Sequence, residues 1–269
     1  MEKFSAAFLD IDGTLISDGE AASPEIKSAL VKIHRLGLNT QRSVGQAEKI
    51  FDRKEVNISL PSIILSGGEI WDLGKAMIKA FPLPQETRNG LSDIVMNHRE
   101  DIALARFYPK GDRHIHFYVA NDELEAKFAA LYKSTNSFGK MTRNIDEFSK
   151  WLKETETCMV TIRTLKKTDI QFPKALRDNI ETDPSSKTDY VITDKGVRKA
   201  TSLLWLCEYL GIDPAKVLTA GDNPAVDSEV FKHTFGISVA PEILPYAKIN
   251  VKTVQELASL LDNIFSNNE

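Results

Sequence analysis

Cysteines and long apolar runs are scarce in this chain. Only two cysteines occur, Cys158 and Cys207, and they lack the paired spacing of a zinc site. Both stand in apolar surroundings, so we expect them to be reduced and packed in the interior. No segment reaches the roughly 18 consecutive apolar residues of a membrane-spanning helix. The apolar run from Phe4 to Leu9 is too short for the core of a signal peptide. We therefore expect a cytoplasmic protein without a membrane partner.

A strong excess of basic residues is also absent. The 34 Lys and Arg residues stand against 38 Asp and Glu residues, which gives a formal net charge of −4. This balance argues against a broad basic surface for nucleic acid, although it permits a local cationic pocket for an anionic substrate.

The composition is that of a folded protein with a sizeable core. Of the 269 residues, 42% are hydrophobic and 27% are charged, and no internal repeat or low-complexity tract interrupts them. Because the chain is longer than the usual domain of about 100–200 residues, one large α/β domain and a core with a second module are both open, and we favour two modules.

The first third alternates between strand and helix patterns. Residues 4–9 form an apolar strand pattern. A helix is expected from Ser23 and Pro24 to Gly37, because Ser is a good N-cap and Pro suits the first helical position. An extended piece over residues 38–40, a helix over about residues 43–54 and a strand over residues 62–65 follow. Such alternation predicts a parallel sheet with crossover helices and a site at the carboxyl ends of its strands.

The pattern changes after Phe81 and returns near the end of the chain. Residues 81–189 mix helix-like and strand-like stretches, which predicts an inserted α+β module. A helix over about residues 197–210, closed by Gly211, and a strand over residues 217–220 then resume the alternation. We therefore assign residues 1–80 and 190–269 to one domain and residues 81–189 to the other.

The segment Asp10-Ile11-Asp12-Gly13-Thr14-Leu15 carries the strongest chemical signal, because it places two carboxylates two residues apart directly after a buried strand. One carboxylate can attack phosphorus while the other reaches the leaving oxygen, which suits nucleophilic and general acid catalysis. The alternative interpretation is a pair of Asp residues that caps a turn.

This segment resembles the first motif of the haloacid dehalogenase superfamily, most members of which are phosphohydrolases. The resemblance is to the Cof-like, sugar-phosphatase-like subfamily IIB. It implies that Asp10 forms an aspartyl-phosphate. It also implies that Asp12 protonates the departing alcohol and then activates the hydrolytic water.

The second and third motifs of this family also have counterparts. Asn39-Thr40-Gln41-Arg42 stands where relatives have Ala-Thr-Gly-Arg, so Thr40 and Arg42 would bind the phosphoryl group. Gln41 replaces the usual Gly, so the loop must avoid a positive φ there or bear a cost. Thr40 alone is equally typical of a helix N-cap. The third motif selects Lys199, with Lys195 as the alternative; its cation would bind substrate and lower the pKa of the attacking carboxylate.

The fourth motif is Gly221-Asp222-Asn223-Pro224-Ala225-Val226-Asp227. The resemblance implies a Mg²⁺ cofactor held by Asp10, the Asp12 carbonyl and Asp222, with Asp227 binding the metal through water or orienting Lys199. Hard oxygen ligands of this kind suit magnesium. Asp227 is alternatively an ordinary residue at a helix N-terminus.

The position of the insertion, between the second and third motifs, implies the large α/β cap of sugar phosphatases. Candidate specificity residues in it are Arg106, His114, His116 and Arg163. Alternating residues on a strand face are more often ordinary solvated positions, and two histidines without a third ligand make a weak metal site. Backbone amides of Gly67 and Gly68 would approach substrate, or these residues form a turn that leads to the cap.

These features predict an α/β protein: a Rossmann-like, doubly wound parallel core with an inserted α+β cap. The function that they favour is Mg²⁺-dependent hydrolysis of a small phosphorylated metabolite, such as a sugar or polyol phosphate, by a monomer or homodimer. A phosphomutase would use the same aspartyl-phosphate chemistry. A non-catalytic binding module on the same fold is a further alternative, supported by the departures at Gln41 and Ala200.

Overall fold

The chain forms two compact units. The computed structural model describes residues 4–17, 21–51, 55–134, 137–166, 170–183 and 189–266. The first unit comprises Met1–Arg42, Ala47–Ile78 and Lys199–Glu269, and the second comprises Ser43–Gln46 and Lys79–Arg198. No helix in the described ranges is long and apolar enough to cross a membrane.

A five-stranded parallel sheet forms the centre of the first unit, in the order β14-β13-β12-β1-β2. Its strands are β1 (Ala6–Leu9), β2 (Leu36–Leu38), β12 (Val217–Gly221), β13 (Phe235–Val239) and β14 (Ile249–Val251). The chain winds outward from β1 to β2, and the C-terminal segment continues on the other side of β1. The order therefore reverses between β1 and β12, where open α/β sheets bind their ligands. The predicted doubly wound core is confirmed.

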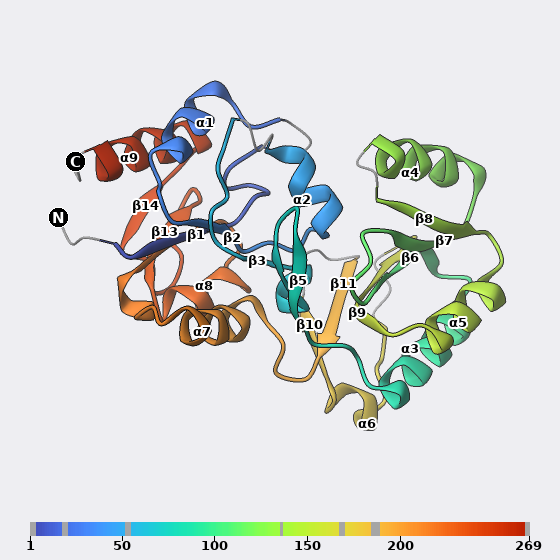
Figure 1. The fold of residues 1–269 in the computed structure, drawn as a ribbon. Helices are drawn as coiled ribbons and strands as arrows, with labels where there is room; N and C mark the ends of the chain where they lie inside the picture. Colours follow the sequence, from blue (N-terminus) through green and yellow to red (C-terminus); the bar gives the residue numbers. More distant parts are fainter. Residues whose placement is uncertain are drawn as a thin grey trace. The chain divides into compact units, whose positions relative to one another are not determined.

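Helices cover both faces of this sheet (Figure 1). The helices α1 (Pro24–Val31) and α9 (Val254–Ser266) pack together on one face, and α7 (Lys199–Leu210) and α8 (Asp227–Phe231) lie on the other. Ser23 caps α1 as predicted, since its side chain accepts a hydrogen bond from the Ile26 amide. The unit also contains η2 (Pro214–Lys216), and α2 (Val44–Ile50) follows β2 in the chain.

The predicted extension of α1 to Gly37 was wrong, because the helix ends at Val31 and Gly37 lies in β2. The reason is packing in the sheet. A Cβ atom on Gly37 would lie 2.5 Å from the Phe8 ring and 2.8 Å from the Pro61 carbonyl oxygen. The expected helix over residues 43–54 ends at Ile50, and residues 52–54 lie outside the described residues.

A small sheet follows the second helix, in the order β3-β4-β5. Its strands are β3 (Ser62–Ile64), β4 (Glu69–Asp72) and β5 (Ala76–Ala80), and the short helix η1 (Leu65–Gly67) connects the first two. A parallel bridge between Asn39 and Ile63 places β3 next to the end of β2. The residues after β2 and β3 therefore meet at the carboxyl edge of the parallel sheet.

The second unit is built on a six-stranded sheet in the order β10-β11-β9-β6-β7-β8. Neighbouring strands are antiparallel except β7 and β8, which α4 joins. The elements are α3 (Gln85–Asn97), β6 (Ile102–Pro109), β7 (Ile115–Val119), α4 (Asp122–Ser134), β8 (Phe138–Thr142), α5 (Ile145–Glu154), β9 (Thr157–Thr164), α6 (Lys174–Arg177), β10 (Ile180–Asp183) and β11 (Asp189–Asp194).

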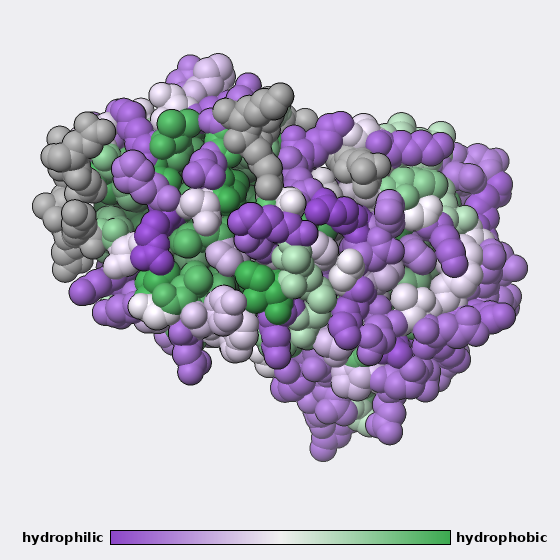
Figure 2. Space-filling view, viewed as in Figure 1, coloured by the Kyte–Doolittle hydropathy of each residue, from purple (hydrophilic) through white to green (hydrophobic). Residues whose placement is uncertain are grey.

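The core of the second unit lies between one face of this sheet and the helices α3 and α5. Phe107, Phe148 and Ile162 are buried there, while the surface over the two helices is mainly hydrophilic in Figure 2. The second unit extends to Arg198, whereas we predicted the return to the first domain at residue 190. The difference arises because β11 pairs with β9 and β10.

Replacing Gly37 by Ala tests the packing of β2. We expect Gly37→Ala to lower the free energy of unfolding by about 1–3 kcal/mol, because the added methyl group overpacks against Phe8. Thermal unfolding followed by circular dichroism measures the change. Gly90→Ala in α3 is the control, since its Cβ would meet only the flexible end of Leu176 at 3.3 Å. A Gly37→Ala protein as stable as the native chain would contradict the close packing of Gly37 against Phe8.

Candidate active site

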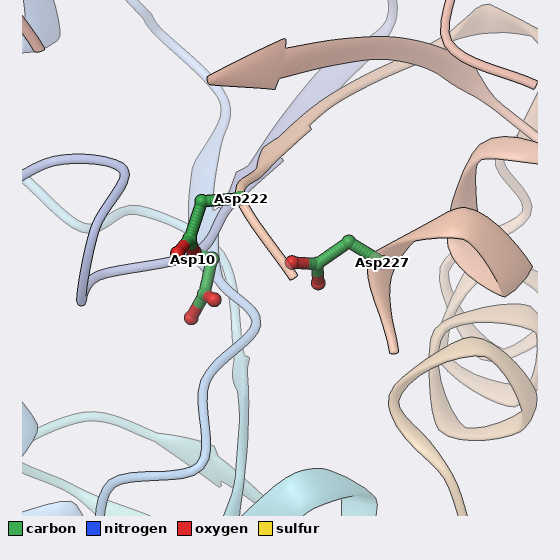
Figure 3. Close-up of side chains that lie close together, drawn as sticks. All are labelled: Asp10, Asp222 and Asp227. Carbon is green, nitrogen blue, oxygen red and sulfur yellow. The ribbon is translucent and has the colours of Figure 1, made fainter. Parts of the chain in front are cut away.

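Three carboxylates meet at the point where the strand order reverses. Asp10 follows β1 and donates its backbone N–H to the Ala220 carbonyl of β12 at 3.0 Å. Asp222 follows β12, and Asp227 begins α8. All three side chains point toward one another (Figure 3), and each offers an oxygen within 4.8 Å of the others.

Two glycines make this convergence sterically feasible. Gly13 has a φ of +70°, and a Cβ atom there would lie 2.2 Å from Oδ2 of Asp222. A Cβ atom on Gly221 would lie 2.3 Å from Cγ of Asp227. Any other residue at either position would displace a carboxylate from the cluster.

Lys199 provides the positive charge among these carboxylates. It is the first residue of α7, and its side chain is 2% exposed. Its Nζ lies 2.7 Å from Oδ2 of Asp10 and 3.1 Å from Oδ1 of Asp227. Lys195, the alternative candidate, is 58% exposed and pairs with Glu181 at 3.5 Å. The structure thus brings Lys199 to Asp10.

The electrostatics of the cluster are dominated by burial. Burial, together with the charge of Asp227, raises the pKa of Asp10 to about 7 against the opposing effect of Lys199. Burial and the charge of Asp227 likewise raise the pKa of Asp222 to about 6. Burial lowers the pKa of Lys199, but Asp10 and Asp227 more than offset this, so the pKa is raised above its ordinary value. With all groups ionised, three negative charges face one positive charge.

The oxygens of the cluster fit a hard divalent cation, which prefers carboxylate ligands. Asp227 has both oxygens in hydrogen bonds, since Oδ1 accepts from Lys199 and Oδ2 from the Asn223 amide at 3.0 Å. Asp222 accepts a long hydrogen bond of 3.3 Å from Thr14. Asp10 also has both oxygens engaged, since Oδ1 accepts from the Ile11 amide at 2.8 Å and Oδ2 lies 2.7 Å from Lys199. Asp222 is therefore the carboxylate best placed to bind a cation directly.

Asp12 and Arg42 form an ion pair that the sequence did not reveal. Nε and Nη2 of Arg42 donate to the two oxygens of Asp12 at 2.8 and 2.6 Å. The Asp12 side chain is 45% exposed, in contrast to the buried Asp10. Thr40 is fully buried, and its hydroxyl oxygen accepts from the Arg42 amide at 3.3 Å. Arg42 thus fixes the direction of Asp12.

Gln41 avoids the backbone strain that we considered for it. The described non-glycine residues with positive φ are Leu65, Ser66 and Tyr246. Gln41 lies beside a cavity of about 120 Å³. The residues that line this cavity are Asp10, Asp12, Gly13, Gln41, Lys199, Asp222 and Asn223.

Several predicted site residues lie outside the lining of this cavity. Gly67 and Gly68 do not line it, and neither do Thr40 and Asp227. Conversely, sequence reasoning missed the contacts of Thr14 and Asn223. Both lie inside the motifs, and a polar side chain one or two positions after a motif carboxylate was the available signal.

Three of the four candidate residues of the second unit, Arg106, Arg163 and His114, have hydrogen-bonding partners in the protein. Arg106 donates to the Thr161 hydroxyl at 2.7 Å, and Arg163 makes two hydrogen bonds of 2.6 Å to Asp189. The His114 ring lies 2.7 Å from Asp112.

The second histidine, His116, packs against Phe107 and Trp151. Its burial lowers its pKa to about 4. Within the described residues, no third ligand joins the two histidines in a metal-binding group.

Comparison with known proteins places this geometry in a family. A sequence model described as haloacid dehalogenase-like hydrolase matches residues 7–254. The chain belongs to this hydrolase family. The predicted family membership is thereby confirmed. No curated protein sequence matched the chain.

Several solved structures share the fold over nearly the whole chain. A haloacid dehalogenase-like hydrolase from Bacteroides thetaiotaomicron has a TM-score of 0.77 at 20% identity, covering 97% of this chain and 100% of that one. A protein from Thermotoga maritima has a TM-score of 0.76 at 15% identity, covering 97% of each chain. A subclass IIB sugar phosphatase has a TM-score of 0.75 at 17% identity, covering 96% and 98%.

The raised pKa values predict how stability depends on pH without metal. A pKa of about 7 for Asp10 and about 6 for Asp222 exceeds the value near 4 in unfolded chains. The folded state therefore binds more protons, and these groups reduce stability as pH rises from about 4 to about 7. We expect the Asp222→Asn protein to be more stable than the native chain, and the difference between the two to be larger at pH 8 than at pH 5. Thermal unfolding in the presence of a chelator measures this difference.

Asp262→Asn is the control for this experiment, because it changes a half-exposed carboxylate of α9 that pairs with Lys32. Its effect should not follow the same trend between pH 5 and 8. A stability difference for Asp222→Asn that stays constant across this range would show that Asp222 does not contribute through its charge.

Proposed function

We propose that this haloacid dehalogenase-family hydrolase is a Mg²⁺-dependent phosphatase that forms an aspartyl-phosphate on Asp10. The observation that supports this most directly is the buried contact of 2.7 Å between Asp10 and Lys199 beside two further carboxylates. Lys199 offsets the repulsion between the Asp10 carboxylate and an incoming phosphate dianion, which permits nucleophilic attack.

The chemistry takes two steps. In the first, an oxygen of Asp10 attacks phosphorus, the bond from phosphorus to the alcohol oxygen breaks, and Asp12 gives its proton to that oxygen. In the second, Asp12 takes a proton from water while the water oxygen attacks phosphorus, which releases phosphate and regenerates the Asp10 carboxylate. Arg42 donates to both oxygens of Asp12 in this structure, so Asp12 must leave at least one of these hydrogen bonds to carry the proton that it transfers. Thr40 lies at the start of the same loop and supports the position of Arg42.

Mg²⁺ would be held by Asp10, Asp222 and the Asp12 carbonyl, with Asp227 bound to Lys199. The bound ion would neutralise negative charge on the phosphoryl group. Asp227 contributes by holding Lys199 at 3.1 Å, so that the ammonium group faces Asp10. The donation from Asn223 to Asp227 fixes that carboxylate in turn.

We further propose that the second unit, predicted as the inserted module of residues 81–189, recognises the organic part of the substrate. The cavity of about 120 Å³ beside Asp10 is suited to a phosphoryl group and a cation and is small for a whole sugar phosphate. The fold shared with a subclass IIB sugar phosphatase favours a sugar or polyol phosphate as substrate.

Removal of the nucleophile tests the proposal. Phosphate release from sugar phosphates, polyol phosphates, nucleotides and p-nitrophenyl phosphate should require Mg²⁺ and stop with a chelator. Asp10→Asn should lower kcat by more than about 10⁴-fold, because the covalent intermediate no longer forms. Circular dichroism checks that the variant is folded. Substantial residual turnover would exclude Asp10 as the nucleophile, and an isomeric phosphate ester as product would favour a phosphomutase.

A comparison of two lysines tests the cationic residue. Lys199→Ala should reduce kcat/KM by at least about 10²-fold, since a buried cation next to the nucleophile is lost. Lys195→Ala should stay within about twofold, because that side chain is mostly exposed. Steady-state kinetics on the best ester of the panel measure both. The reverse ranking would place the functional lysine at position 195.

A further inference from the structure

Three consecutive residues after β3 have left-handed backbone conformations. The φ angles are 52° for Leu65, 54° for Ser66 and 102° for Gly67. Two of these residues are not glycine, so the turn carries a conformational cost that the surrounding contacts must offset. All three residues are buried in the first unit.

On one side, the turn binds the loop that contains Thr40 and Arg42. The Leu65 amide donates to the Arg42 carbonyl at 3.1 Å, and the Ser66 amide donates to the Thr40 carbonyl at 3.2 Å. An extended strand directs successive N–H groups to opposite sides. The left-handed conformation allows two neighbouring amides to bind the same loop.

On the other side, the turn binds the helix that carries Lys199. The Gly67 carbonyl accepts a hydrogen bond of 2.8 Å from the hydroxyl of Ser202. Ser202 is 2% exposed and lies three residues after Lys199 in α7. Residues three apart share one face of a helix, so this contact fixes the first turn of α7 close to the lysine.

We infer that Ser202 is a positioning residue for Lys199. Its hydrogen bond to Gly67 holds α7 against the same turn that holds Thr40 and Arg42. The relative placement of the cation and the phosphate-binding loop is then set by one rigid segment, independently of the contact between Lys199 and Asp10. The inference rests on the role proposed for Lys199.

Kinetics on p-nitrophenyl phosphate test this inference through the hydroxyl of Ser202. Ser202→Ala should lower kcat about tenfold while KM stays within about twofold, because misplaced catalytic groups slow the chemical step more than binding. Ser202→Thr retains the hydroxyl and should recover most of the rate. Ser202→Cys keeps the size with a weaker donor and should be intermediate. It also serves as the test if Ser202→Ala does not fold.

Ser59→Ala is the matched control. The Ser59 hydroxyl also donates to a backbone carbonyl, that of His34 at 2.7 Å, but it lies at the amino end of β2, away from the catalytic edge. Its loss should lower thermal stability without changing kcat. Equal kinetics for Ser202→Ala and Ser59→Ala would overturn the inference, as would an effect on KM alone.

A second readout does not depend on turnover. Amine acylation followed by mass spectrometry reports the accessibility of Lys199, with the exposed Lys195 as internal reference. We expect labelling of Lys199 relative to Lys195 to rise several-fold in Ser202→Ala and to stay unchanged in Ser59→Ala. Unchanged labelling in Ser202→Ala would overturn the inference. Absence of hydrolysis by the native chain would instead count against the proposed function, which keeps the two failures distinct.

Discussion

The buried ammonium group of Lys199, held between Asp10 and Asp227, is the interaction on which the rest of the site depends. A buried charge is tolerated only when it is paired and hydrogen-bonded, and removal of one partner leaves the others uncompensated. The two glycines, Gly13 and Gly221, serve the same arrangement, because each leaves room for a neighbouring carboxylate. The glycines at these two positions and the ion pairs of Lys199 are therefore requirements of the same arrangement of carboxylates.

The topology of the sheet explains why these residues meet although they are far apart in sequence. Asp10 and Asp222 follow adjacent parallel strands, and the strand order reverses between them. Lys199 reaches the same point from the start of a helix on one face of the sheet. The long insertion between the second and third motifs adds no strand to this parallel sheet, since the two units divide within β5 of the small sheet and again at the start of α7.

Much of this arrangement was predictable from the sequence, since motifs after apolar strands place their polar residues at one sheet edge. Lys199 was preferred over Lys195 by the resemblance of its segment to the third family motif, and the structure puts Lys199 beside Asp10. Three features were not predictable. The strand at Gly37 depends on its contact with Phe8, and the ion pair of Arg42 depends on loop geometry that spacing does not encode. The third is the left-handed turn after β3, which is set by contacts with distant segments.

The two carboxylates of the first motif lie in different environments, which fits the different roles that we propose for them. Asp10 is buried beside a lysine and two acidic residues, whereas Asp12, two positions later, is half-exposed and paired with Arg42. A nucleophile must be shielded from water and face the phosphorus atom, while a proton carrier must exchange with solvent between the two halves of the reaction. The alternation of side-chain direction over two residues would place both on the same side. Their environments differ because Asp10 lies 2.7 Å from Lys199, whereas Asp12 pairs with Arg42.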